Sequence, residues 1–325
     1  MKNISDLMGI REGVRVLDAT LRDGGLVNDF RFTDEFAQKL YQTNIEAGVD
    51  CMEVGYKASK KLFDEEKFGM WKFCNDDAVA RVLGSNTDGR IKLAVMADVG
   101  RCDYKDDIVE KANSPLDIIR VACYVNQIAG AIDMIEDAKK KGYFVTCNIM
   151  AISTAQEGDV RVALEMLGHS PVDVIYIVDS FGSLFPEQIA RIAMLYKEYA
   201  DKFSKKLGIH AHNNQQLAFA NPIEALGDGV DWLDGTYSGM GRGAGNCYIE
   251  SLLGLLRNPK YNIFPAIKFV EEEMPKLRKA GSVWGWDLQY LVTGILNQHP
   301  RAAIAFTKDR RTDYSEFYKD MLSQD

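Results

Sequence analysis

The sequence predicts an α/β fold, a (β/α)8 TIM barrel followed by a C-terminal helical extension. Eight short runs of β-branched and apolar residues recur at intervals of about 25 to 40 residues. Between these runs, apolar residues repeat at three- and four-residue spacing, which is typical of amphipathic helices. The 325 residues also leave room for a barrel, which takes about 250 residues, and a smaller extension.

The strand candidates are, in chain order, residues 14–19, 51–54, 91–97, 117–122, 143–149, 172–178, 207–212 and 232–236. The first helix between them has Phe36 and Leu40 at four-residue spacing and closes at Gly48. A later helix carries an apolar stripe over residues 128–135, and another begins at Pro186, since a first helical turn tolerates proline. The turn after the first strand lacks the G-x-G-x-x-G pattern of a dinucleotide-binding sheet, which argues against that rival fold.

The predicted division of the chain is a catalytic barrel over residues 1–256 and a helical extension over residues 257–325. Beyond residue 256 the strand pattern ends and helical patterns continue, with breaks expected at Pro265, Pro275, Gly281 and Pro300. The extension is too short for an independent enzyme domain. We therefore expect it to cap the barrel mouth, to build a subunit interface, or both.

Composition excludes several classes of protein. The net charge is −8 and the basic residues are spread along the chain, so neither nucleic acid nor a membrane surface is an expected partner. Residues 1–10 carry one lysine and no long apolar run, so no signal peptide is expected. The six cysteines show no C-x-x-C spacing, which predicts reduced thiols and a cytoplasmic protein.

His210 and His212 are the strongest local signal for chemistry. Residues two apart in a strand point the same way, with Cα atoms roughly 6.6 Å apart, so two imidazoles can bind one divalent ion. Asp23, after the first strand, adds a carboxylate at the same end of the barrel. Two nitrogens and one carboxylate leave positions for water and substrate, as in catalytic sites; Mn, Mg, Zn, Co and Fe all suit them. The alternative is a pair of buried histidines bonded to the backbone.

Arg22 lies beside Asp23 and is expected to point into the same barrel mouth. Its planar guanidinium suits a carboxylate or the oxyanion of an enolate, although an ion pair with Glu53 or Asp179 is the structural alternative. After the eighth strand, a glycine-rich segment over residues 239–245 permits tight turns and close backbone approach. Asn246 follows it, and supplies either a fourth, neutral oxygen ligand or the cap of the next helix.

Further substrate-binding candidates stand where the strands end, because the functional face of a barrel lies at the carboxyl ends of its strands. These candidates are Glu53, Tyr56, Arg120, Asn148, Asp179 and Thr236.

Together these motifs resemble the DRE-type TIM-barrel metallolyases. The similar segments are Asp18-Ala19-Thr20-Leu21-Arg22-Asp23-Gly24, His210-Ala211-His212-Asn213 and the glycine-rich run that ends at Asn246. This superfamily includes 3-hydroxy-3-methylglutaryl-CoA lyase, the isopropylmalate and homocitrate synthases, and 4-hydroxy-2-oxovalerate aldolase. The layout is most similar to the aldolase branch, which also has a helical C-terminal extension.

The resemblance implies one divalent metal ion, held by Asp23, His210 and His212, with Asn246 as the occasional fourth ligand. It implies that Arg22 steadies an enolate oxygen while a C–C bond forms or breaks. A homodimer through the extension is a further expectation, and some relatives pair with an aldehyde dehydrogenase.

The sequence departs from the aldolase pattern at one catalytic position. Those aldolases have a histidine shortly after the first-strand aspartate, whereas residues 25–31 of this chain contain none. The general base is therefore expected to be Asp29, which is close in sequence, or His299 if the extension folds over the barrel mouth. Tyr56 and Tyr290 are weaker candidates. The chain thus looks like a divergent member of the branch.

The function predicted first is a metal-dependent aldolase that works through the enolate of a 2-oxo acid. It cleaves a 4-hydroxy-2-oxo acid to pyruvate and an aldehyde, or joins pyruvate to an aldehyde or sugar. A Claisen-type acyltransferase that condenses an acyl-CoA with a 2-oxo acid, like isopropylmalate synthase, is the second hypothesis. The third is a metal-binding barrel that has lost catalysis and serves as a partner subunit.

Overall fold

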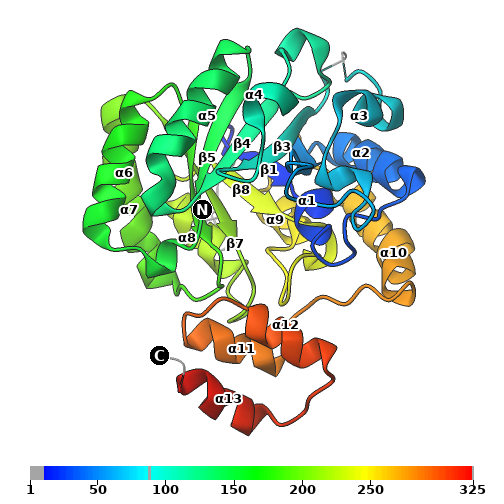
Figure 1. Ribbon diagram of the computed structural model, residues 1–325, viewed down its shortest axis with the longest axis vertical. Coiled ribbons are helices and arrows are strands. Elements are labelled where there is room, and N and C mark those ends of the chain that lie inside the picture. Colours follow the sequence, from blue (N-terminus) through cyan, green and yellow to red (C-terminus); the bar gives the residue numbers. More distant parts are fainter. Residues whose placement is uncertain (1–10, 87–88, 324–325) are drawn as a thin grey trace, which may run out of the picture.

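The computed structural model describes residues 11–86 and 89–323, and its centre is a closed barrel of eight parallel strands (Figure 1). Each strand pairs with the next along the chain, and the last pairs with the first. The strands are β1 (Arg15–Asp18), β2 (Cys51–Tyr56), β3 (Lys92–Asp98), β4 (Ile118–Cys123), β5 (Phe144–Ile149), β6 (Val174–Asp179), β7 (Lys206–Ala211) and β8 (Trp232–Gly235). The predicted TIM barrel is confirmed, and both ends of every strand candidate lie within two residues of the ends of the observed strand.

Helices cover the outside of the barrel and continue past it at the C-terminal end (Figure 1). They are α1 (Thr20–Gly24), α2 (Asp34–Ala47), α3 (Asp76–Leu83), α4 (Tyr104–Asp107), α5 (Ile128–Lys140), α6 (Glu157–His169), α7 (Pro186–Phe203), α8 (Ala220–Gly227), α9 (Ile249–Leu255), α10 (Ile263–Lys279), α11 (Leu288–Ile295), α12 (Arg301–Lys308) and α13 (Tyr314–Leu322). Short 3-10 turns lie at residues 70–72, 111–113, 125–127, 152–154 and 237–239.

The α2 helix shows how local sequence sets these elements. The Thr33 hydroxyl accepts a hydrogen bond from the backbone N–H of Phe36, which satisfies one of the free donors of the first turn. Phe36 and Leu40 are buried against the barrel. At the other end Gly48 adopts a φ of 74°, the left-handed conformation that closes a helix and that glycine adopts without strain.

The side chains that fill the barrel form layers, because alternate residues of each strand point inward. The layer near the amino ends of the strands is apolar, and there Phe144 and Trp232 stack with ring centroids 5.5 Å apart. Two residues further along the strands the interior is charged. Arg120 lies there between Glu53 and Asp234, and all three side chains are fully buried to within 1% exposure. This charged layer supports the barrel mouth above it.

The α10 helix packs against the barrel helices α2 and α9, and Phe36 contacts Phe269 with ring centroids 5.4 Å apart. It continues through both Pro265 and Pro275, so the helix breaks predicted at these positions are wrong. Pro265 lies in the first turn, where its missing N–H has no helical acceptor. Pro275 costs one backbone hydrogen bond, and the burial of Phe269 and Met274 on the same helix offsets that loss.

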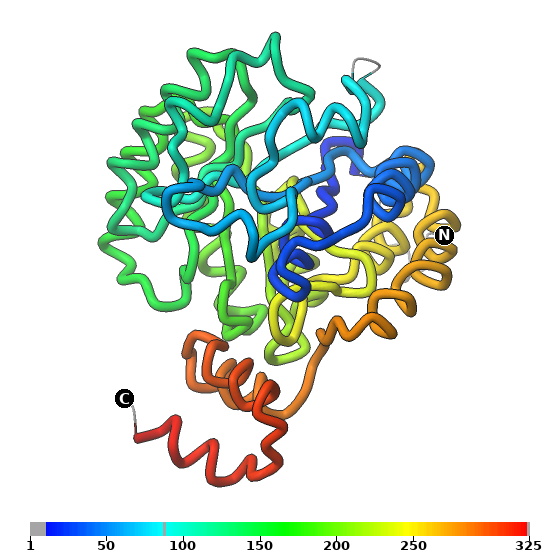
Figure 2. Tube along the Cα trace, turned by 45° about the vertical axis from the view of Figure 1, so that its right-hand side comes forward, coloured from blue at the N-terminus to red at the C-terminus, as the bar shows by residue number. Residues whose placement is uncertain are grey.

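Helices α11, α12 and α13 form a separate small cluster beside the barrel (Figures 1 and 2). The cluster has its own apolar core, in which Tyr290, Phe306 and Phe317 are buried together with Ala244 of the glycine-rich loop. The predicted division after residue 256 assigns α10 to the extension, whereas α10 packs against barrel helices. That division stays a prediction.

The cluster and the segment that leads to it cover the loops at the carboxyl ends of the strands. The Trp284 indole N–H donates to the carbonyl of Ser238, and the Trp286 indole N–H donates to that of Asn214. The Asn297 amide donates to the carbonyl of Ser153. Through these contacts with the loops after β8, β7 and β5, the extension caps the barrel mouth.

Three further expectations concern the cysteines, membrane-spanning helices and a signal peptide. The six cysteines are free thiols, and all but Cys102 are buried. No helix among residues 11–86 and 89–323 is long and apolar enough to span a membrane. Residues 1–10, on which the absence of a signal peptide was predicted, lie outside the described residues.

Candidate active site at the barrel mouth

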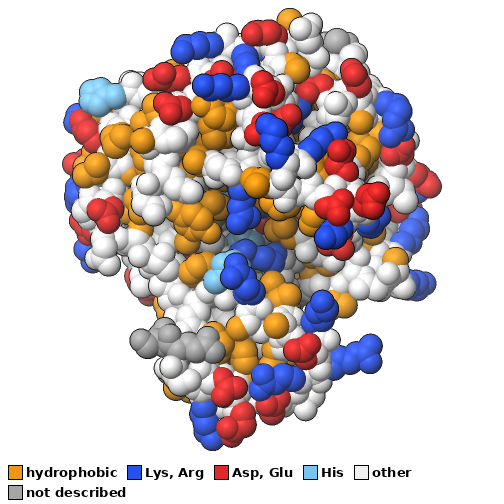
Figure 3. All heavy atoms as spheres, in the orientation of Figure 1, with side chains coloured by type: hydrophobic (Ala, Val, Ile, Leu, Met, Phe, Trp, Pro, Cys, Tyr) orange, Lys and Arg blue, Asp and Glu red, His pale blue; other side chains and the backbone are white. Residues whose placement is uncertain are grey.

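A cavity of about 80 Å³ opens at the carboxyl ends of the strands and is lined by the chemical groups that the sequence singles out. Asp23, His210 and His212 lie on its wall together with Arg22 and Arg242. The space-filling view shows a hollow in this face of the molecule, with Lys or Arg and His side chains gathered at its centre (Figure 3).

A larger groove, of about 460 Å³, lies away from this mouth between α6 and α7. Its charged side chains pair with one another, since both Arg161 and Arg191 bind the carboxylate of Glu157. The groove therefore presents no cluster of free chemical groups, and the smaller cavity is the candidate active site.

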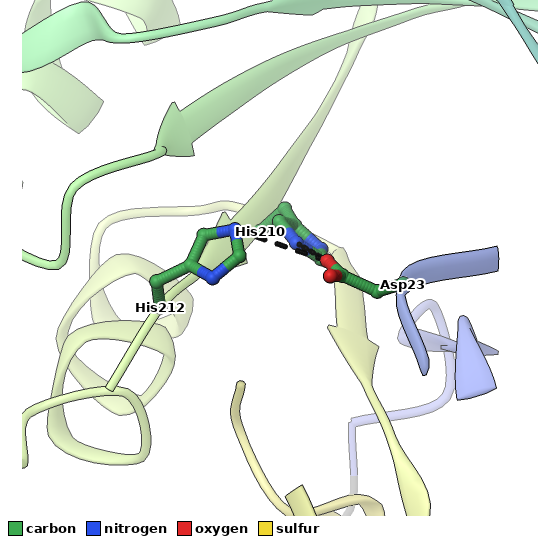
Figure 4. Close-up of side chains that lie close together, drawn as sticks. All are labelled: Asp23, His210 and His212. Carbon is green, nitrogen blue, oxygen red and sulfur yellow. Dashed lines mark hydrogen bonds and ion pairs between the residues drawn. The ribbon is translucent and has the colours of Figure 1, made fainter. Parts of the chain in front are cut away.

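Three potential metal ligands converge in the cavity (Figure 4). Asp23 is fully buried in α1, and its Oδ2 lies 3.1 Å from Nε2 of His210 and 3.8 Å from Nε2 of His212. One ligand atom from each residue lies within 4.8 Å of the others. The two histidines point the same way from β7 and the residue after it, as predicted from their spacing.

The glycine-rich loop after β8 closes one side of this group. A Cβ atom on Gly241 would lie 3.1 Å from Oδ1 of Asp23 and 2.1 Å from the Asn246 amide nitrogen, so only glycine fits there. The backbone N–H of Arg242, the next residue, donates to Oδ1 of Asp23 at 3.3 Å. The small residue in the loop thus lets the chain hold the carboxylate through its backbone.

Burial and the charges around the cavity keep two of the three groups, Asp23 and His212, in the states that a metal ion needs. Burial acts to raise the pKa of Asp23, but the Arg22 guanidinium and the two histidines outweigh it and hold that pKa well below its usual range. Burial also lowers the pKa of His212 well below its ordinary value. At neutral pH the cavity therefore contains a carboxylate and at least one neutral imidazole, which are the forms that bind metal ions.

His210 is oriented by a residue that the sequence analysis did not identify. Its Nδ1 lies 3.0 Å from Oδ2 of Asp234, which leaves Nε2 facing Asp23. Burial lowers the pKa of His210, but its hydrogen bonds to Asp23 and Asp234 outweigh burial and raise it. The clue in the sequence was an aspartate inside the apolar strand 232–236, two residues before Thr236 and therefore on the same inward face.

We expect Asp234→Asn to weaken metal binding about 10- to 100-fold, because outer partners of metal-ligating histidines typically contribute that much. The amide can no longer hold the Nδ1–H tautomer as a carboxylate does. Asp231→Asn is the matched control, since Asp231 lies before β8 and its carboxylate forms a 3.6 Å surface ion pair with Lys206, away from the cavity lining. Calorimetric titration with Mn²⁺ measures the difference, and equal affinities of the two variants would contradict the assigned role.

Arg22 is held at the cavity wall by two carboxylates. Its NH1 lies 2.9 Å from Oδ2 of Asp23, and its Nε lies 2.7 Å from Oε2 of Glu53. Oε2 of Glu53 also accepts from NH1 of Arg120 at 3.0 Å. The ion pair with Glu53, one of the structural alternatives, is therefore present, and it fixes the guanidinium beside Asp23.

The structure brings only some of the other predicted binding residues to the cavity. Tyr56 and Asn148 line it, and the Asn148 amide nitrogen has no hydrogen-bond partner among the described residues. Glu53 and Arg120 lie beneath it in the charged layer. Asp179 and Thr236 are not among the lining residues: the Asp179 carboxylate accepts backbone N–H groups of the loop after β6, and Thr236 takes part in a backbone bridge.

The two residues predicted as general base lie in different places. Asp29 is exposed, adopts a φ of 54° and lies outside the lining of the cavity. His299 reaches the rim, where its Nε2 lies 3.2 Å from NH1 of Arg242 and its ring contacts Phe181. Burial, followed by the charges of Arg242 and Arg301, lowers the pKa of His299 to about 4. Its imidazole is therefore neutral at pH 7.

Asn246, the predicted fourth ligand, is buried beside His212 through a backbone bridge. Its amide nitrogen donates to the carbonyl of Met240, and its Oδ1 accepts no hydrogen bond from the described residues. The other cavity residues that sequence reasoning missed are mostly apolar or carry no motif: Leu26, Met96, Met150, Val178, Ser180 and, in the glycine-rich loop, Arg242.

Glu250 supports this loop from α9, where its carboxylate accepts the backbone N–H of Ser238. Burial raises its pKa from 4.5 to about 7. The folded protein thus holds a proton that the unfolded chain releases near pH 4.5, so this group lowers the free energy of unfolding as the pH rises from about 4.5 to about 7. Glu250→Gln should abolish that loss.

We expect the stability of Glu250→Gln relative to the wild type to increase across this pH window by about 1–3 kcal/mol. Urea unfolding at several pH values measures it. Glu187→Gln, at an exposed position in the first turn of α7, is the matched control and should show no such trend. A parallel response of the two variants would refute the assignment to Glu250.

Comparison with known proteins shows the family to which the chain belongs. Residues 13–271 match the HMGL-like family, and this match covers the whole barrel and about half of α10. An oxaloacetate decarboxylase of Mycobacterium tuberculosis is 28% identical over 251 residues, which make up 74% of this chain and 69% of that protein. A 4-hydroxy-2-oxovalerate aldolase of Bacillus cereus is 25% identical over 319 residues, 92% of this chain and 88% of that protein.

Among solved structures, the N-terminal domain of a candidate aldolase from Bacteroides vulgatus superposes with a TM-score of 0.75 at 25% identity. The match covers 90% of this chain and 96% of that one. The curated relatives named above are an aldolase and a decarboxylase, which are both lyases. The prediction that the chain is a lyase is therefore confirmed as an enzyme class. The chain is a lyase-type enzyme that belongs to the HMGL-like family.

Proposed function

We propose that the protein is a divalent-metal-dependent aldolase that cleaves or forms a C–C bond through the enolate of a 2-oxo acid. The observation that carries this proposal is the group formed by Asp23, His210 and His212, with the Arg22 guanidinium bound to the same carboxylate. The aldolase relatives support the reaction class. The substrates we propose are a small 2-oxo acid such as pyruvate and an aldehyde or sugar.

The residues present fit a divalent cation. One carboxylate and two imidazoles suit Mn, Mg, Zn or Co, and the unpartnered Oδ1 of Asn246 offers a fourth oxygen. When bound, the cation supplies Lewis acidity toward the carbonyl group of the 2-oxo acid. Asp234 and the backbone N–H of Arg242 hold His210 and Asp23 in place for it.

The side chains of the protein account for the remaining steps. Arg22, fixed by Glu53, would donate N–H groups to the oxygen on which enolate charge develops, and such fixed donors act strongly because they need no reorganisation. His299 is the better placed of the two predicted bases, since it is neutral at pH 7 and lies at the rim. It would accept the proton of the 4-hydroxyl group as the C3–C4 bond breaks, once its Nε2 exchanges the contact with Arg242 for the substrate.

Decarboxylation of oxaloacetate is a second candidate, favoured by the relative from M. tuberculosis. Loss of carbon dioxide from oxaloacetate gives the same pyruvate enolate. It needs no base to remove a hydroxyl proton, which agrees with the missing histidine after Asp23.

Release of pyruvate tests the proposal. Lactate dehydrogenase and NADH report pyruvate from 4-hydroxy-2-oxovalerate and from oxaloacetate, with Mn²⁺ or with a chelator, and protein-free samples correct for spontaneous decarboxylation. We expect metal-dependent release. If neither acid is consumed but free CoA thiol appears from an acyl-CoA and a 2-oxo acid, the Claisen-type alternative replaces the proposal.

A homodimer through the extension remains a further proposal. The segment before α11 and α11 itself expose large apolar side chains, notably Val283 at 69% and Ile295 at 56%. Sedimentation of the purified protein tests it, and a monomer at micromolar concentration would contradict it.

A further inference from the structure

Arg242 differs from the other two arginines of the barrel mouth in its partners. Arg22 and Arg120 each bind two carboxylates. No carboxylate of the described residues lies within the 4.0 Å ion-pair distance of the Arg242 guanidinium, although its side chain lines the cavity and is largely shielded from solvent. The nearest opposing charge, that of Asp23, acts on it from beyond this distance and is already shared by Arg22 and His210. A shielded guanidinium in this position favours a further anionic partner.

The neutral contacts of Arg242 hold its guanidinium but do not exhaust it. NH2 donates to the carbonyl of Ser180 at 2.8 Å, and NH1 lies 3.2 Å from Nε2 of His299. A guanidinium has five N–H donors, so three remain, including the buried Nε, which has no partner among the described residues. These are enough for a two-point hydrogen bond to a planar or tetrahedral anion.

The positions of the two cavity arginines separate their roles. Arg22 is bound to Asp23 and Glu53, next to the proposed metal ligands, and therefore serves the reacting end of the substrate. Arg242 comes from the loop after β8, the neighbour of β1, but its guanidinium reaches across to the β6 loop and the extension, where it contacts Ser180 and His299. The extension thus helps to set what the cavity recognises.

We propose that Arg242 binds a second anionic group, a carboxylate or a phosphate, on the aldehyde part of the substrate. This inference rests on the proposed function and narrows its substrate class. It also favours aldol chemistry over decarboxylation, because a guanidinium on the leaving carboxylate of oxaloacetate would stabilise the charge that must be lost. In an aldol reaction the second anion keeps its charge throughout.

The synthetic direction offers matched substrates. C3 of pyruvate loses a proton to the base, its electron pair forms the bond to the aldehyde carbon, and the carbonyl oxygen takes up a proton. Acetaldehyde and glyoxylate differ by a methyl group against a carboxylate. Glycolaldehyde and glycolaldehyde phosphate differ by the phosphate. Each pair gives a ratio of kcat/KM for the charged over the neutral aldehyde, and the two ratios distinguish a carboxylate from a phosphate.

We expect Arg242→Gln to lower the ratio for the preferred anion about 10- to 100-fold, the usual effect of losing a hydrogen bond to a charged group. Arg301→Gln is the matched control, since it removes a positive charge that also acts on His299 but belongs to an exposed residue outside the lining of the cavity. It should leave the ratios unchanged.

Two results would overturn the inference without touching the proposed function. One is an equal loss of activity of Arg242→Gln with charged and neutral aldehydes. That result would mean that the arginine acts on the aldehyde carbonyl group, which both kinds of substrate contain. The other is failure of the wild-type protein to use either anionic aldehyde while it still exchanges the C3 protons of pyruvate. Absence of that exchange would instead refute the proposed function.

Discussion

Asp23→Asn is expected to reduce metal-dependent turnover by about a thousandfold or more. The substitution removes the only carboxylate of the proposed metal site, and even outer partners of metal ligands contribute 10- to 100-fold. An amide oxygen keeps the shape of the side chain but not its charge. It also loses the ion pair with Arg22, so the guanidinium beside the reacting oxygen is less firmly held.

Asp29→Asn provides the matched control, because it makes the same chemical change six residues away at an exposed position outside the cavity. The rate of pyruvate release is compared between the two variants at equal concentrations of folded protein. Full activity of Asp23→Asn would contradict the metal assignment, and a large loss in Asp29→Asn would show that the exposed aspartate takes part after all.

Arg120→Met is expected to lower the free energy of unfolding by about 3–5 kcal/mol, the usual cost of breaking a buried ion pair. Arg120 has no exposed surface and donates to Glu53 and Asp234 from the middle of the barrel, where it also stacks on Tyr176. Its removal leaves Glu53 with only Arg22, and Asp234 with only His210, as a charged partner among the described residues. Methionine fills much of the volume of the arginine side chain but supplies no positive charge to either carboxylate.

Arg15→Met is the control for this prediction. Arg15 forms an ion pair with Asp50 at 3.6 Å, but 43% of its side chain is exposed, and such surface pairs contribute about 1 kcal/mol or less. Urea unfolding monitored by fluorescence compares the variants. Similar stabilities would mean that the charged layer does not support the barrel as we describe.

The fold could be predicted because the barrel repeats one local rule. Each β-rich run followed by an apolar helical stripe packs in only one way when eight of them close a sheet. The exceptions came from packing between distant segments. Pro275 reads as a helix breaker, yet α10 continues because the residues around it are buried against α2 and α9.

The convergence of Asp23, His210 and His212 could be predicted from the spacing of the two histidines and from the place of Asp23 after the first strand. The residues that support this group could not. The spacing of Asp234 places it on the inward face of its strand, but its contact with His210 depends on the closed barrel, and the position of Arg242 depends on the course of a glycine-rich loop. His299 illustrates the same limit: its place at the rim depends on how the extension folds.

The exchange of the C3 protons of pyruvate in deuterated buffer is the most direct test of the central claim. Proton NMR follows the methyl signal with the protein and a dilute amount of Mn²⁺ or Mg²⁺, against a sample with chelator and a sample of Asp23→Asn. The account predicts loss of the methyl signal only with wild-type protein and metal. A methyl signal that persists although metal binding is demonstrated would contradict enolate formation from a 2-oxo acid at this site.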